Sequence, residues 1–371
     1  MILASFESVM DAILYIFIAL LILMFMITIH ELGHYLAGKI FKFKINEFSI
    51  GMGPKLFSRK NKKTNEVFSI RLIPLGGYCA FEGEDEDNAS EFAFNNQKPW
   101  KRLIVLFSGA FLNFVSAVII VIIAFSIFGN TLPQVDTSYE QHTVTEVEGV
   151  QVIVTNPNKF EKGDIVLEIN GKQLYLAVDI SKMIDRAPES CDVKVLRNGE
   201  EIVLTGITKS NYYYTDSNGV VKTGFGWGVS YRLGGPEVPK VNYSFGQALA
   251  KSVPYCFRTA GFVLETLGQL ITGALGIDQI GGPITTIDVT SQVARTGIGN
   301  ILMLITLVSV NLAVFNLLPI PALDGSRMVF VIIEWIARKP VNRKVEGIIH
   351  LVGMVLLFGF VILVDLLRLF G

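Results

Sequence analysis

Two histidines and a glutamate lie at a spacing that can bind and use a metal ion. The stretch His30-Glu31-Leu32-Gly33-His34 is an H-E-x-x-H sequence that follows a long uncharged run. In a helix, residues four apart differ by roughly 40° around the axis, so both imidazoles face one side. Two such rings can hold Zn²⁺ with Glu31 as the general base that activates a zinc-bound water. The motif therefore predicts His30 and His34 as ligands and Glu31 as the catalytic group.

The surroundings of this motif favour a ligand set over a chance match. Five-residue sequences of this kind also occur in ordinary helices that bind nothing. Here the motif follows Ala12 to Ile29, which contains no charged residue. Ionisable side chains are costly inside a membrane unless they pair or bind something. A helix end that simply emerges into the cytoplasm is the less favoured interpretation.

A carboxylate from the other end of the chain can complete the site. The sequence NLLPIPALDG runs from Asn316 to Gly325 after a later apolar run, and its two prolines interrupt a helix. It brings Asp324 to about the depth of His30 and His34 if both apolar runs cross a membrane. Two histidines and an aspartate with an open fourth position are the ligand set of a catalytic zinc. A simple Asp-Gly turn that ends a helix is the alternative.

The elements that must position these residues are apolar helices. The chain of 371 residues is 51% apolar and only 18% charged, whereas soluble domains carry about 25% charged residues. A helix of about 20 residues crosses the hydrocarbon core. We therefore predict a polytopic α-helical membrane protein with four transmembrane helices. The predicted spans are 12–29, 103–128, 301–318 and 348–367.

The distribution of Lys and Arg orients these spans. None precedes Lys39, whereas residues 39–102 carry twelve and residues 327–344 carry five. Basic connections stay in the cytoplasm, so the termini and residues 129–300 are expected outside. The overall charge of -1 gives no basic excess for nucleic acid. The lipid bilayer is the expected environment.

Three further segments read as separate elements. Residues 68–84 alternate around a Pro-Leu-Gly-Gly sequence and predict a hairpin-like, cytoplasmic-side, membrane-associated β element, followed by a solvated acidic loop from Glu84 to Asp87. Residues 136–235 contain short β-type runs and two Asn-Gly turn signals, typical of a mostly-β extracytoplasmic domain. Residues 244–276 predict an amphipathic helix on the outer membrane surface, or a tilted and partly buried one. The predicted domains are a membrane half at 1–128, the β domain at 136–235, the surface helix at 244–276 and a second membrane half at 297–371.

Three motifs together resemble the signatures of a known family. The H-E-x-x-H sequence, the stretch FSIGMGP from Phe48 to Pro54, and NLLPIPALDG resemble those of the site-2 protease family of intramembrane zinc metalloproteases. The likeness is greatest to its regulator of sigma-E protease branch. The sequence GDIVLEING, from Gly163 to Gly171, is similar to a PDZ signature of that family, in a single-PDZ bacterial form.

The resemblance implies a function and further site residues. It implies a zinc metalloendopeptidase of the bacterial inner membrane, with its active site toward the cytoplasm and its PDZ-like domain outside. Its substrates would be single-pass membrane proteins, namely anti-sigma factors or remnant signal peptides. Asn316 would hold the substrate backbone, and Gly76, Gly77 and Tyr78 would receive an unwound substrate as an added strand.

Several alternatives stay open at this stage. A membrane metal transporter or an inactive, protein-binding scaffold could carry the same residue types. The PDZ-like domain could bind peptide ends or exclude large substrates. Asn113 could hydrogen-bond near the zinc or tie two helices together, and His350 could support the site or pack an interface.

Overall fold

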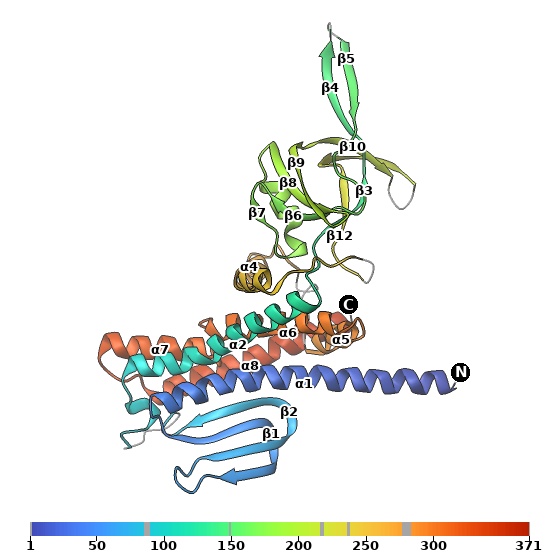
Figure 1. The fold of residues 1–371 in the computed structure, drawn as a ribbon. Coiled ribbons are helices and arrows are strands. Elements are labelled where there is room, and N and C mark those ends of the chain that lie inside the picture. Colours follow the sequence, from blue (N-terminus) through green and yellow to red (C-terminus); the bar gives the residue numbers. More distant parts are fainter. Residues whose placement is uncertain are drawn as a thin grey trace. The chain divides into compact units, whose positions relative to one another are not determined.

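The computed structural model describes residues 2–84, 90–147, 150–215, 219–235, 238–276 and 283–370. The chain divides into two compact units (Figure 1). The first, here called the helical unit, comprises Met1–Ala124 and Thr259–Gly371. The second, the β unit, comprises Phe125–Arg258. The predicted acidic loop falls mostly at residues 85–87, which lie outside the described residues.

Within the described part of the chain, four helices are long and apolar enough to cross a membrane, as predicted. The first of them, α1, continues about ten residues beyond the predicted end of its span. The H-E-x-x-H motif therefore lies inside a helix rather than at its end, which fixes both imidazoles on one face. The four helices are α1 (Ile2–Ile40), α2 (Pro99–Ile127), α6 (Ile298–Leu317) and α8 (Arg343–Phe370).

Other helices were only partly foreseen. Helix α4 (Phe245–Ile271) falls within the predicted amphipathic segment, whereas α5 (Pro283–Ala294) has no predicted counterpart. Helix α7 (Asp324–Ala337) starts at the candidate ligand, although residues 327–344 were predicted as a basic connection. The basic residues of this region suggested a connection between spans. Helix α7 is strongly amphipathic and buries only one face, so such residues are compatible with a helix.

The predicted hairpin-like segment differs from the observed one. Residues 68–84 supply mainly one strand, β2 (Val67–Phe81), whose partner is β1 (Ile45–Lys60). Both strands bend, so that Glu47–Ile50 pairs with residues 67–70 on one side and with residues 77–80 on the other. The bends use Gly51, Gly53 and Gly76, which have φ values of 83°, 81° and 88° in the region that favours glycine.

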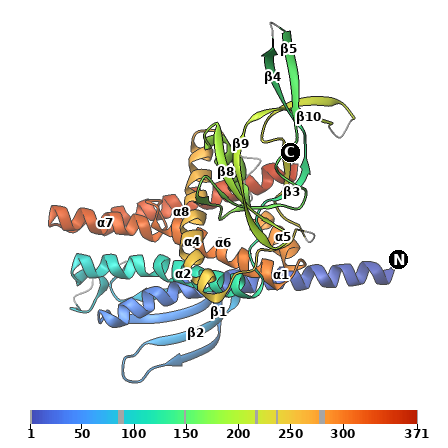
Figure 2. The ribbon, with the colours of Figure 1, turned by 45° about the horizontal axis from the view of Figure 1, so that its top comes forward.

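The β unit is built from two sheets. One has the order β12-β3-β6-β8-β9, with β7 beside β6, and the other has the order β11-β10-β4-β5. Figures 1 and 2 show β4 and β5 extending as a hairpin beyond the rest of this unit. The strands are β3 (Gln134–Ser138), β4 (Gln141–Val147), β5 (Val150–Asn156), β6 (Ile165–Ile169), β7 (Lys172–Gln173), β8 (Ser190–Arg197), β9 (Glu200–Thr208), β10 (Ser210–Thr215), β11 (Val221–Gly226) and β12 (Val229–Arg232).

Local turn chemistry explains the tight connections of this unit. Asn170-Gly171 joins β6 to β7 and Asn198-Gly199 joins β8 to β9, each with positive φ at both residues. Such pairs suit two-residue hairpins because their twist matches that of the strands. The core behind them includes the buried Trp227 and the short helix α3 (Ile180–Arg186).

Candidate metal centre

Three ligand-type side chains converge inside the helical unit. His30 Nε2 lies 2.9 Å from Asp324 Oδ2, and His34 Nε2 lies 3.2 Å from the same oxygen. The two Nε2 atoms are 3.1 Å apart. Ligands about 2.0–2.1 Å from a tetrahedral zinc are about 3.3 Å from one another, so this donor set fits the ion. Both histidines are buried and Asp324 is nearly so.

The partner of the second histidine leaves the correct nitrogen for a metal. His34 Nδ1 lies 2.8 Å from the carbonyl oxygen of Val105 in α2. A carbonyl only accepts, so Nδ1 carries the hydrogen and donates it. Nε2 of the neutral ring then presents a lone pair to the site.

The partner of the first histidine is Asn113, also in α2. Its side-chain amide lies 3.4 Å from His30 Nδ1, and its Oδ1 atom is buried without a hydrogen-bond partner. A 180° turn of the amide brings Oδ1 to the imidazole. His30 Nδ1–H then donates to Oδ1, which resolves the orphaned acceptor and frees Nε2 for zinc. The buried polar atom therefore supports the metal fit.

Helix α2 approaches the two imidazoles through glycines. A Cβ atom on Gly109 would lie 2.5 Å from His34 Nε2, and one on Gly33 would lie 2.3 Å from the Ser108 carbonyl oxygen. Neither contact is compatible with a side chain, so glycine is needed at both positions for α1 and α2 to pack this closely. Local sequence does not indicate this need at Gly109, because the imidazoles that it faces belong to another helix.

The loop before Asp324 is held by α8. Ala322 has a left-handed φ of 78°, and its N–H donates to His350 Nδ1 at 3.0 Å. A Cβ atom on Gly353 would lie 2.1 Å from Pro321 Cβ, so α8 and the loop are in close contact. His350 therefore supports the site through the backbone rather than as a ligand.

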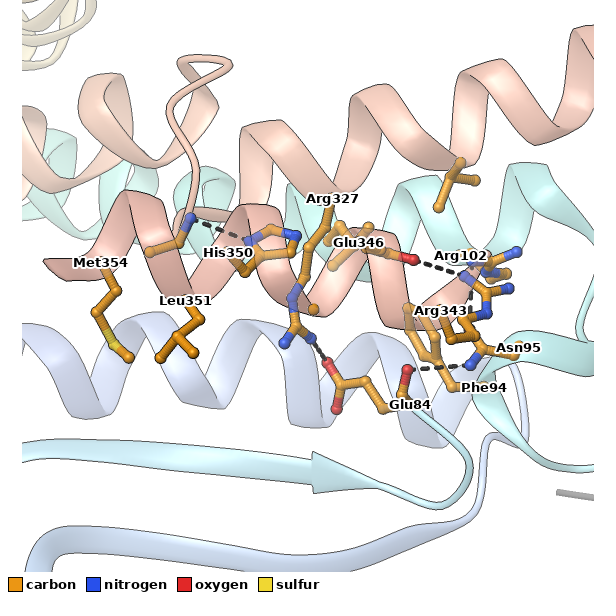
Figure 3. A pocket seen from close by; sticks show the side chains of 14 residues that line it. Glu84, Phe94, Asn95, Arg102, Arg327, Arg343, Glu346, His350, Leu351 and Met354 are labelled. Carbon is orange, nitrogen blue, oxygen red and sulfur yellow. Dashed lines mark hydrogen bonds and ion pairs between the residues drawn. The ribbon is translucent and has the colours of Figure 1, made fainter. Parts of the chain in front are cut away.

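A cavity of about 360 Å³ lies beside this loop (Figure 3). Arg327 pairs with Glu84 across it, and Arg343 pairs with Glu346 at 2.8 Å. Glu84 is thus part of an ion pair, whereas the sequence predicted it in a solvated loop. Because the arginines are paired with carboxylates, we treat this cavity as structural.

A buried ion-pair cluster, here called the Glu334 cluster, fixes α7. Glu334 accepts from Arg102 of α2 at 2.5 Å, from Arg343 of α8 at 2.8 Å and from the Val341 N–H at 2.9 Å. Arg102 and Glu334 are both more than nine-tenths buried. The cluster therefore ties three helices together at the end of the helix that begins with Asp324.

Glu31 lies near both the donor atoms and β2. It interacts electrostatically with His30, His34 and Asp324, and its carboxylate accepts a hydrogen bond from the Cys79 backbone N–H. A Cβ atom on Gly77 would lie 3.7 Å from Glu31 Cγ and only 2.8 Å from the Ser49 carbonyl oxygen. The predicted catalytic group is therefore beside the predicted substrate strand.

The remaining predicted residues, Tyr78, Gly76 and Asn316, have different surroundings. Tyr78 is held by Arg71, whose Nη2 lies 2.5 Å from the Tyr78 hydroxyl. Gly76 forms a bend of β2 against Met52. Asn316 is half-buried in the last turn of α6.

Comparison with known proteins identifies the family. The profile of Peptidase family M50 matches residues 18–360, a range that contains all four residues of the site. The chain belongs to peptidase family M50. A Fusobacterium nucleatum protein named as a candidate zinc metalloprotease is 34% identical over 94% of this chain and 96% of its own length. A Clostridium perfringens protein named in the same way is 30% identical over 95% and 98%.

A third relative carries an individual name. Zinc metalloprotease RasP of Bacillus licheniformis is 26% identical over 93% of this chain and 97% of its own length. Together with the four apolar helices, these matches make this M50 peptidase a multi-pass membrane protein and a zinc-dependent intramembrane protease. They favour the protease over the transporter and the inactive scaffold that the sequence left open.

Proposed function

We propose that this M50 peptidase hydrolyses peptide bonds within transmembrane segments of single-pass membrane proteins, with Glu31 as general base. The observation that carries the proposal is the convergence of His30, His34 and Asp324 donor atoms beside Glu31. These three side chains would hold zinc. When bound, zinc polarises the scissile carbonyl and makes water easier to deprotonate.

Glu31 would move the protons of the reaction. Its carboxylate takes a proton from the attacking water and returns it to the leaving amine. The hydrogen bond that the Cys79 N–H donates to Glu31 holds the carboxylate in place beside the strand. Burial excludes bulk water, which strengthens these electrostatic interactions.

The edge of β2 would present the substrate in extended form. A helical peptide bond is sterically closed, so a transmembrane substrate must unwind before it is cut. Residues 77–80 pair with β1, and within this segment Gly77 and Cys79 lie next to Glu31. We assign Gly76, Gly77 and Tyr78 to a strand that receives the extended substrate. We assign Asn316 to holding the backbone of that substrate.

The membrane arrangement follows from charge. We place the basic hairpin and the region of α7 in the cytoplasm of a bacterial cell and the β unit outside, because Lys and Arg gather in those connections. We assign the β unit as the PDZ-like domain and α4 as the amphipathic surface helix. Anti-sigma factors and remnant signal peptides are the proposed substrates, on the strength of the family signatures.

The decisive test is Glu31→Gln in liposomes that contain the purified chain and a single-pass substrate peptide. We expect about one zinc per chain to be retained while cleavage falls at least about 1,000-fold, because the ligands remain and the base is lost. Glu200→Gln, an exposed acid of the β unit, is the matched control and should cleave normally. Cleavage by Glu31→Gln at the wild-type rate would disprove the role of Glu31.

A further inference from the structure

A groove of about 720 Å³ runs between α1 and the β1–β2 hairpin. Leu32 and Tyr35 of α1 form one wall, and Phe48 and Phe68 of the hairpin form another. The two phenylalanine rings stack with centroids 6.1 Å apart. The groove is therefore lined by apolar surface directly beside a membrane helix, and it does not include the metal centre.

The rim of this groove is basic. Arg59, Lys60 and Lys62 line it, and Lys63 follows in the same turn; all four are exposed. The neighbouring carboxylates already have cationic partners outside this set. Glu66 pairs with Lys39, and Glu47 pairs with Lys55 and Arg71. Among the residues that the structure describes, the rim consequently carries positive charge that no ion pair balances.

The surface of the same hairpin is unusually apolar for an exposed sheet. Large side chains at its bends and outer strand are strongly exposed: Met52 (47%), Leu56 (65%), Phe57 (53%), Leu72 (57%) and Ile73 (43%). Exposed apolar patches of this kind mark membrane or partner contacts. Apolar bends together with a basic turn match a lipid interface, with hydrocarbon next to the bends and phosphate next to the turn.

We propose that this groove binds an anionic phospholipid. Its phosphate would lie against Arg59, Lys60 and Lys62, and its acyl chains along the wall formed by Leu32, Phe48 and Phe68. Basic residues attract anionic headgroups, and the apolar wall favours a lipid over a free anion. Bound lipid would fix the hairpin against α1, on which Glu31 lies. The position of the substrate strand would then depend on the lipid composition of the membrane. The inference needs α1 in the membrane but does not depend on the proposed proteolysis.

Native mass spectrometry of the purified full chain tests this proposal. The probes are dioleoylphosphatidylglycerol, dioleoylphosphatidylcholine and inorganic phosphate, each titrated in the same detergent. We expect the anionic lipid to bind at least about 10-fold more tightly than the zwitterionic one, and millimolar phosphate to leave it bound. Because each basic residue near such a headgroup contributes several-fold, the R59Q/K60Q/K62Q variant should lose about 100-fold in affinity.

A matched control separates a local site from general charge. The K162Q/K172Q/R186Q variant also removes three positive charges, but from exposed positions of the β unit. It should bind the anionic lipid like the wild type. Phe68→Ala should weaken the binding of both lipids, since it shortens the apolar wall. Equal binding of the two lipids, equal loss in both triple variants, or displacement by phosphate alone would each overturn the proposal. These lipid affinities do not depend on catalysis. If the zinc-loaded chain failed to cleave a substrate, the proposed function would fail but the lipid proposal would not.

Discussion

Two buried polar clusters in the helical unit differ in how their charges are balanced. In the Glu334 cluster, two arginines and a backbone N–H donate to one carboxylate, so donors from the protein balance the buried anion. In the candidate metal centre, two imidazole nitrogens and the Asp324 oxygen lie 2.9–3.2 Å from one another. Three lone pairs directed at one point repel unless a cation lies between them.

The comparison separates a structural polar cluster from a binding site. Both clusters are largely buried, so burial alone does not identify function. The distinguishing property is that the Glu334 carboxylate meets donors from the protein, whereas the acceptors of the candidate metal centre converge without one. Both clusters hold α7, one at its first residue and the other near its end. Their substitutions should therefore have opposite consequences.

The largest expected effect is the loss of metal in Asp324→Ala. Removing one of three protein ligands should lower bound zinc from about one to less than about 0.1 per chain and abolish cleavage. The fold should survive, because the substitution also removes an unbalanced acceptor. Metal analysis after dialysis and thermal unfolding in detergent with chelator measure the two quantities. Full zinc content would remove Asp324 from the ligand set.

The reciprocal substitution, Glu334→Ala, should damage the fold instead. It leaves Arg102 buried without its carboxylate partner, and Arg343 with Glu346 alone, which costs about 3–5 kcal/mol. Reversible unfolding in mixed micelles, with chelator present, measures the loss. Glu201→Ala removes an exposed partner of Lys194 and should cost less than about 1 kcal/mol. A similar small cost for Glu334→Ala would contradict the contrast between the clusters.

A subtler change tests the support of the first imidazole. Asn113→Leu removes the acceptor for His30 Nδ1–H and should weaken zinc binding about 10- to 100-fold, which is typical when such partners are lost. Asn113→Asp keeps an acceptor at this position and should bind zinc more tightly than the leucine variant. Ser116→Ala, one turn away in α2, is the control. Competition with a chelating dye gives the affinities; equal values for all variants would make Asn113 a helix-packing residue only.

The smallest expected effect concerns the hairpin and pH. Burial disfavours the Glu47 carboxylate, but hydrogen bonds from Ser69, Lys55 and Arg71 outweigh it and lower its pKa from 4.5 to about 2. A lowered folded pKa stabilises the protein above pH 4.5, and this stabilisation is lost as the pH falls toward 2. Glu47→Gln should therefore cost on the order of 1 kcal/mol at pH 7 and almost nothing near pH 2. Unfolding of both proteins across this range checks the sign; a difference independent of pH would exclude the ionised carboxylate as its source.

Much of the fold could be predicted because it depends on local rules. Span lengths follow from bilayer thickness, and the Asn-Gly turns follow from backbone preferences. The bends of β1 and β2 could not be predicted. Near its glycines each strand changes the segment of the other strand with which it pairs, and this pairing depends on contacts far along the chain. The ion pair between Glu84 and Arg327 joins residues 243 apart, and no local pattern indicates it.

The candidate site divides in the same way. By itself the sequence determined the donor types and the 3.6-residue period that puts His30 and His34 on one face of α1. Only the tertiary structure decided that Asp324, 294 residues from His30, meets them, and that Val105 and Asn113 orient the rings. The physical reason is helix packing. Close contacts at Gly33, Gly109 and Gly325 set the distances between helices, and those distances decide whether three side chains can share one ion.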